Sequence, residues 1–176
     1  LTSLADWSIL GDWIGKQVRP GWNVPFGPMP LIRGLPSYIS FASKKALTAA
    51  AANYGCAMLW AEGHTECPDL TGAEESLVFT EQDLASRYDE LAPKGQVDLI
   101  VIGCPQASLE EIRITAAAVR SYSEMGQLIP DERLWVFTSR HNYELAEADG
   151  SIGILEEAGA VILQDTCPEV TPYNRN

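Results

Sequence analysis

From residue 43 onward, short apolar runs alternate with longer segments of helical character. The runs are "CAMLWA", "VDLIVI", "LWVFT" and "AVILQ", at residues 56–61, 97–102, 134–138 and 160–164. Continuously apolar strands separated by helices are typical of a parallel sheet that is covered on both faces. We therefore predict an α/β fold with three layers, in which helices lie on both faces of a mostly parallel sheet.

The segments between these runs carry start and stop signals for helices. Thr80 and Ser108 are each followed three residues later by an acidic residue, Asp83 and Glu111 respectively, which is the spacing of a capping box. Several of the same segments end in glycine, the residue that most often terminates a helix. These glycines are Gly55, Gly126, Gly150 and Gly159.

The first 42 residues have a different character. Residues 3–18 have apolar side chains at helical spacing, and Ser3 with Asp6 resembles a capping box. Five prolines then fall between Pro20 and Pro36, which indicates an irregular connection. We therefore divide the chain into residues 1–42, an N-terminal helix with a Pro/Gly-rich connection, and residues 43–176, an α/β domain.

Charge and composition exclude several classes of partner. The net charge is −12, so the phosphate backbone of nucleic acids and the anionic surface of membranes both repel this chain. No apolar stretch reaches the roughly 20 residues that span a bilayer. The 176 residues contain four widely spaced cysteines and no CxxC pair, which disfavours a secreted disulfide scaffold and a thiol-redox protein. A cytoplasmic location follows as the expectation.

Two Cys-Pro pairs follow directly on predicted strands. Cys104-Pro105 comes after the second run and Cys167-Pro168 after the fourth. Ligands of parallel α/β sheets bind outside the carboxyl ends of the strands, so both thiols are expected at one edge, where they can ligate iron or zinc. The alternative is that each cysteine is a small buried hydrophobe, the commonest role of unpaired cysteine.

The remaining candidates lie in loops or at helix starts. Cys56 begins a strand and is expected in the core, while Cys67 shares the loop "EGHTECPDL" with His64 and Glu66. Three residues are candidates for binding a substrate anion: Thr65 through its hydroxyl, Ser108 at a helix N-terminus, and Arg140 through its guanidinium. Thr171 is a further hydroxyl of the same kind. No residue is identified as a general base.

Three stretches resemble the aconitase X family: "GCPQASLEE", "DTCPEVTP" and the alanine-rich helix that leads into "GCAMLWAEGHT". Members of that family are hydro-lyases related to the catalytic half of aconitase. The resemblance implies a dehydratase that uses iron, as an iron–sulfur cluster or a mononuclear ion, with Cys104 and Cys167 as ligands. The implied substrate is a small hydroxy acid: cis-3-hydroxy-L-proline is the first expectation and mevalonate 5-phosphate the alternative.

The resemblance also carries departures. The family pattern has histidine after the proline of the first motif, where this chain has Gln106, and a histidine is expected near Trp60. Family subunits are longer and work with a small swivelling domain or subunit, so the chain is expected to be part of a longer protein. The competing hypothesis is a non-catalytic α/β domain that binds a small carboxylate or a partner.

Overall fold

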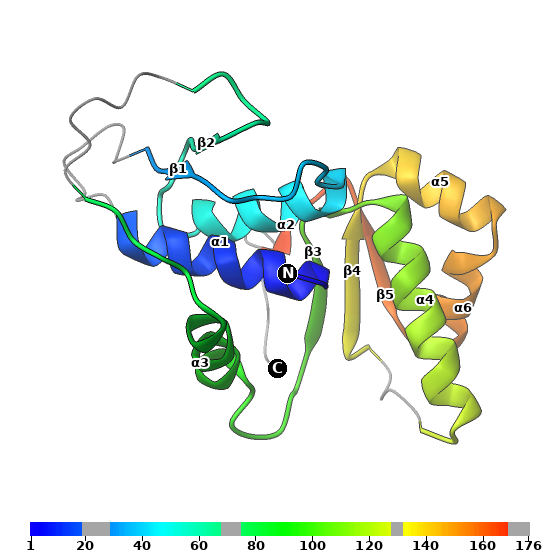
Figure 1. Cartoon of the computed structure of the whole chain (residues 1–176). Helices are drawn as coiled ribbons and strands as arrows, with labels where there is room; N and C mark the ends of the chain where they lie inside the picture. The colour runs from blue at the N-terminus through cyan, green and yellow to red at the C-terminus, as the bar shows by residue number, and fades with distance from the viewer. Residues whose placement is uncertain (19–28, 68–74, 128–131, 169–176) are drawn as a thin grey trace. The chain divides into compact units, whose positions relative to one another are not determined.

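The computed structural model describes residues 1–18, 29–67, 75–127 and 132–168. The chain forms two compact units, Leu1–Ala92 and Pro93–Asn176. The sequence predicted a division after residue 42, whereas the helix at residues 41–52 belongs to the first unit. The two units are described separately below (Figure 1).

The first unit contains three helices and a small parallel sheet. The helices are α1 (Leu4–Val18), α2 (Phe41–Ala52) and α3 (Glu81–Leu91). The strands β1 (Leu31–Ile32) and β2 (Trp60–Ala61) pair in parallel, with Leu31 opposite Trp60. The run at residues 56–61 is therefore a strand over only its last two residues. Its partner, β1, lies in the Pro/Gly-rich connection, where no strand was predicted.

Two glycines explain why α2 packs against α1. A Cβ atom at Gly11 would lie 2.0 Å from the carbonyl oxygen of Leu47, and one at Gly15 would lie 2.7 Å from the ring of Tyr54. Glycines four residues apart lie on one face of a helix, so this face of α1 allows the backbone of α2 to approach closely. The close contact assigns α2 to the first unit and accounts for the shifted boundary.

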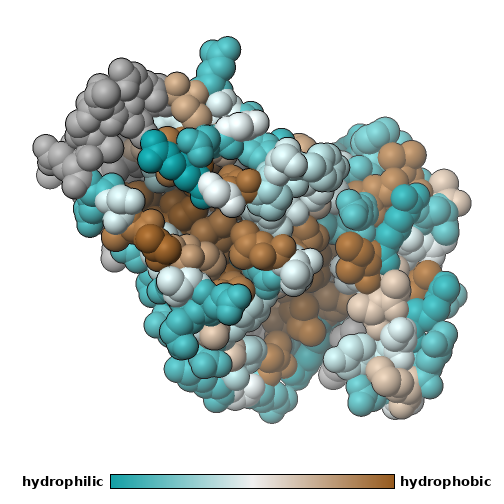
Figure 2. Space-filling view, viewed as in Figure 1, coloured by the Kyte–Doolittle hydropathy of each residue, from teal (hydrophilic) through white to brown (hydrophobic). Residues whose placement is uncertain are grey.

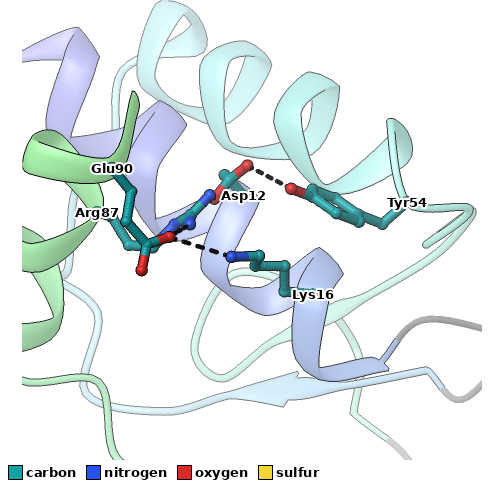
Figure 3. A network of polar contacts seen from close by, with 5 residues as sticks. All are labelled: Asp12, Lys16, Tyr54, Arg87 and Glu90. Carbon is teal, nitrogen blue, oxygen red and sulfur yellow. Dashed lines mark hydrogen bonds and ion pairs between the residues drawn. The ribbon is translucent and has the colours of Figure 1, made fainter. Parts of the chain in front are cut away.

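A polar network joins α1, α3 and the turn that follows α2 (Figure 3). Arg87 of α3 forms ion pairs with Asp12 of α1 and with Glu90, and the hydroxyl of Tyr54 donates to Asp12 at 2.9 Å. Lys16 pairs with Glu90 at 3.2 Å. Arg87 is only 6% exposed, so its charge depends on these carboxylates for compensation.

The second unit is built on a parallel three-stranded sheet in the order β3-β4-β5. The strands are β3 (Ile100–Ala107), β4 (Leu134–Thr138) and β5 (Val161–Gln164). The helices are α4 (Leu109–Glu124), α5 (Arg140–Ala148) and α6 (Ser151–Glu157). The α/β class and the parallel pairing are confirmed. Within this unit the described helices lie together on one side of the sheet (Figure 1).

The core of the second unit lies between β4 and its helices. Alternate residues of β4, Leu134 and Val136, face the helical layer, where Ile112, Ile152 and Leu155 are fully or almost fully buried. The predicted capping box at the start of α4 is present: Ser108 and Glu111 bond to each other's backbone N–H groups. Local sequence signals and the apolar pattern thus agree on how this unit is assembled.

Apolar side chains also reach the surface of the chain. Figure 2 shows hydrophobic residues interspersed with polar ones on the face in view. The most exposed large ones are Tyr38 (81%), Phe41 (79%) and Val78 (76%), all in the first unit. Among the residues that the structure describes, none of the helices is both long and apolar enough to cross a bilayer.

Candidate metal centre at the carboxyl edge of the sheet

Cys104 lies in a bulge of β3 and not after the strand. Ile102 is opposite Val136, and Ala107 is opposite Thr138, so five steps along β3 match two along β4. Residues 103–106 thus stand opposite Phe137 alone, three residues in excess, and form a turn within the carboxyl half of the strand. Cys104 is exposed on this turn, and its peptide bond to Pro105 is cis.

Gly103 allows the bulge to form. Its φ of 106° lies in the region that favours glycine, and a Cβ atom there would lie 2.1 Å from the carbonyl oxygen of Phe137. A side chain at this position would displace either the turn or β4. The glycine therefore permits β3 to leave the regular register immediately before Cys104.

The far end of the bulge is held by two donors. The carbonyl oxygen of Ala107 accepts hydrogen bonds from Thr138 Oγ1 at 2.7 Å and from Asn142 Nδ2 at 3.2 Å. Thr138 is fully buried at the end of β4, and Asn142 lies in the first turn of α5. The turn that carries Cys104 is thus fixed to the neighbouring strand and helix.

The turn after β5 carries Cys167, which is partly buried. It begins at Asp165, whose φ is 53° and whose N–H donates to the carbonyl oxygen of Thr138 at 2.9 Å. The carboxylate of Asp165 accepts from the backbone N–H of Arg140 at 2.9 Å and pairs with the guanidinium of Arg140 at 3.1 Å. These contacts anchor this turn to β4 and α5 as well.

The two turns are linked to each other by Gln106. Its side-chain Nε2 donates to the carbonyl oxygen of Thr166 at 3.1 Å. Gln106 is two residues after Cys104, and Thr166 is the residue before Cys167. Since the three strands are parallel, both cysteine-bearing turns lie at the same edge of the sheet. Neither cysteine is buried among the core side chains.

The predicted anion-binding residues belong to both units, Thr65 to the first and Ser108 and Arg140 to the second. Ser108 is the N-cap of α4, where its hydroxyl and N–H both bond to Glu111, at 2.8 and 2.7 Å. Arg140 begins α5 near the cysteine turns and is paired with Asp165. Thr65 belongs to the first unit, where its hydroxyl accepts from the N–H of Ala61 at 3.0 Å and closes the turn after β2.

The remaining candidate residues, Cys56, Cys67 and His64, lie in the first unit. Cys56 is buried, as expected, and burial raises the pKa of its thiol. Cys67 is exposed in the first unit, and the ring of His64 bonds to the carbonyl oxygen of Pro36 at 2.8 Å. Thr171 lies outside the described residues. The residues that sequence reasoning missed at the edge are Gln106, Thr138, Asn142 and Asp165, because their partners are 25 to 60 positions away.

The donor set at this edge fits part of an iron site. Cys104 and Cys167 offer two thiols, the ligand type that iron–sulfur clusters require. Within residues 1–18, 29–67, 75–127 and 132–168, no three His, Cys, Asp or Glu side chains converge as a metal-binding group. The described residues therefore bring two thiols to this edge of the sheet and do not assemble a complete ligand set there.

Comparison with known proteins supports the resemblance that these motifs carry. A family model described as the aconitase X third domain matches residues 97–176, nearly the whole second unit. The chain is 32% identical over 171 residues to the phosphomevalonate dehydratase large subunit of Aeropyrum pernix, and 34% identical over 175 residues to that of Methanothermobacter thermautotrophicus. These alignments cover 94% and 96% of this chain but 39% and 40% of the relatives.

A solved structure agrees with the sequence relatives. The crystal structure of Thermococcus kodakaraensis aconitase X in its holo-form superimposes with a TM-score of 0.71 at 27% identity. The alignment covers 94% of this chain and 41% of the Thermococcus chain. This chain therefore spans about two fifths of the length of the proteins it matches. The motifs, the parallel sheet and these comparisons agree, and the chain belongs to the aconitase X family.

Proposed function

We propose that this chain is part of the large subunit of an aconitase X-type hydro-lyase, which removes water from a small hydroxy acid. The observation that carries the proposal is the pair of cysteine-bearing turns at one edge of the parallel sheet, linked by Gln106 and Thr166. Ligand sites of parallel α/β sheets lie at this edge. The non-catalytic alternative does not account for two accessible thiols placed there.

In this proposal Cys104 and Cys167 act as thiolate ligands of iron. When bound, the iron supplies a Lewis acid that polarises the hydroxyl of the substrate as a leaving group. Arg140 is the candidate for the substrate carboxylate: it is paired with Asp165, yet its side chain is 71% exposed, and a guanidinium carries five N–H donors. Asp165 would then orient Arg140. Ser108 acts as a helix cap, and Thr65 is a separate candidate for binding an anion within the first unit.

We propose mevalonate 5-phosphate as the substrate. Both relatives reported above are described as phosphomevalonate dehydratase, and each aligns over more than nine tenths of this chain. This choice replaces cis-3-hydroxy-L-proline, the first expectation from the sequence. The assay below therefore includes that compound as a competitor.

We further propose that the active protein includes the rest of the large subunit and a small subunit. Relatives described as large subunits imply a smaller partner, and they extend well beyond the aligned region. Exposed apolar side chains such as Tyr38, Phe41 and Val78 suit contact with such segments, because water solvates them poorly.

The test uses the complete large subunit with its small subunit, purified without oxygen. We expect bound iron and dehydration of mevalonate 5-phosphate, with no turnover of cis-3-hydroxy-L-proline. Cys104→Ser and Cys167→Ser should each abolish activity and reduce iron content. Cys67→Ser, the same change at an exposed cysteine that also precedes proline, should leave both unchanged.

Two results would contradict the proposal. A complete protein that holds no iron and dehydrates neither compound would favour the non-catalytic binding domain. Turnover of cis-3-hydroxy-L-proline alone would retain the hydro-lyase and overturn the choice of substrate.

A further inference from the structure

We infer that Gln106 is a positioning residue that holds the two cysteine-bearing turns together, so that both thiols can bind one metal ion. The inference deepens the proposed function and rests on the metal role of Cys104 and Cys167. Its starting point is the hydrogen bond of 3.1 Å from Gln106 Nε2 to the carbonyl oxygen of Thr166. This bond spans 60 positions of sequence and joins the residues flanking the two cysteines.

Each turn is already attached to the central strand β4. Thr138 Oγ1 holds the Cys104 turn through Ala107, and Thr138 C=O holds the Cys167 turn through the N–H of Asp165. Both attachments lie at the bases of the turns. The cysteines lie beyond these bases, three residues before Ala107 and two after Asp165.

The Gln106 bond acts closer to the thiols than either attachment does. It joins the backbone carbonyl one residue before Cys167 to the side chain of the residue two positions after Cys104. A metal ion that takes two ligands from separate turns gains affinity when those turns are already in place, because less conformational entropy is lost on binding. Gln106 thereby sets the separation of the ligands without contacting the metal.

The test compares two substitutions in the full 176-residue chain. Gln106→Glu preserves the shape of the side chain, removes the N–H donor and places an oxygen against the Thr166 carbonyl. Gln106→Asn retains a neutral amide and shortens its reach. The matched control is Gln164→Glu, the same chemical change at an exposed position at the end of β5.

The first measurement is amide hydrogen exchange without metal. Both Gln106 variants should exchange about tenfold faster at the amides of residues 165–167, the effect of losing one hydrogen bond. Exchange in β4 at Val136 and Phe137 should stay unchanged, which also shows that the variants are folded. Exchange at the wild-type rate at residues 165–167 in both variants would overturn the inference.

The second measurement is the affinity for Cd²⁺, added alone under reducing conditions and followed by thiolate absorption. We expect wild type and Gln164→Glu to bind equally, and both Gln106 variants to bind about tenfold more weakly. Equal affinity in all four proteins would overturn the positioning role. If the wild-type chain binds no Cd²⁺, its two thiols do not bind one ion together and the positioning role is wrong, while the iron content of the complete subunit decides the metal role of the cysteines.

Discussion

Gly103 is the residue on which the geometry of the candidate site most depends. We expect Gly103→Ala to reduce the free energy of unfolding by about 3 kcal/mol, the sum of a backbone penalty and the displacement of β4. The first cause is its φ of 106°, and the second is the 2.1 Å approach of a Cβ atom to the Phe137 carbonyl oxygen. Urea denaturation measures the change.

The control for this prediction is Gly126→Ala. Gly126 also has a positive φ, 72°, but nothing lies within 4 Å of a Cβ atom built there. Its substitution should cost about 1 kcal/mol, from the backbone alone. Equal losses at the two positions would mean that the close approach to β4 does not shape the bulge.

The lowered pKa of Asp6 makes the free energy of unfolding depend on pH. The backbone N–H of Thr2 and the hydroxyl of Tyr88, at 2.6 and 2.7 Å, hold the pKa of Asp6 well below its ordinary value. A carboxylate whose pKa is depressed in the folded state stabilises that state above its unfolded pKa, about 3.9. This contribution is lost as the pH falls below that value.

Substitution of Asp6 tests this dependence. The free energy of unfolding of Asp6→Asn should be lower than that of wild type at pH 7, and the difference should shrink steadily below about pH 4. Urea denaturation across this range measures it. Asp89→Asn, the same change at an exposed position of α3, serves as the control. A difference that stays constant with pH would contradict the role of the Asp6 charge.

At the scale of elements, the ion pair of Arg87 with Asp12 is the most buried of the polar contacts that attach α3 to α1. We expect Arg87→Met to cost about 3 kcal/mol, because it leaves the largely buried carboxylate of Asp12 without its cation. The double variant Asp12→Leu/Arg87→Met should recover most of this loss. A loss of about 1 kcal/mol in the free energy of unfolding should remain, because the hydroxyl of Tyr54 loses its acceptor.

Glu90→Gln provides the comparison within the same network. Glu90 also pairs with Arg87, but its side chain is 57% exposed, so water compensates for the lost charge. Its effect on unfolding in urea should be far smaller than that of Arg87→Met. An equal effect, or a double variant no better than Arg87→Met, would show that the ion pair is not what joins α3 to α1.

Signals between residues close in sequence predicted most helices and strands. Features that depend on contacts between distant residues could not be predicted from the sequence. The capping boxes at Thr80 and Ser108 were predictable because each involves residues three apart. Strand β1 was missed because two residues among prolines show no pattern of their own and become a strand only by pairing with β2. The bulge of β3 was missed for the same reason, since its register is defined only against β4.

The candidate site could be predicted only in part. The Cys-Pro pairs after apolar runs identified the edge of the sheet, because parallel strands bring their carboxyl ends together. The sequence did not identify Gln106 and Asp165 as the residues that join and anchor the turns, since nothing in a single sequence pairs positions 60 or 25 apart. The close contact of α2 with the glycines of α1 places α2 in the first unit. The sequence did not show which helix those glycines would face.

At the scale of the whole molecule, the proposed metal role of Cys104 and Cys167 requires further ligands from outside the described residues. Clusters that keep one iron open for substrate are held by three cysteines, and the described residues bring together no group of three ligands. The related proteins are about two and a half times as long as the aligned region, since it covers 39% and 40% of them. We therefore expect the complete large subunit to retain iron through anaerobic gel filtration, and the 176-residue chain to lose it.

Iron per protein and visible absorption measure this difference. Cys104→Ser/Cys167→Ser in the complete subunit should reduce its iron to the level of the isolated chain, because one remaining thiolate cannot hold a cluster against dilution. Cys67→Ser should retain the wild-type amount. If the isolated chain instead keeps stoichiometric iron, its own 176 residues contain the full ligand set, and the division of the site between this chain and the rest of the subunit is wrong.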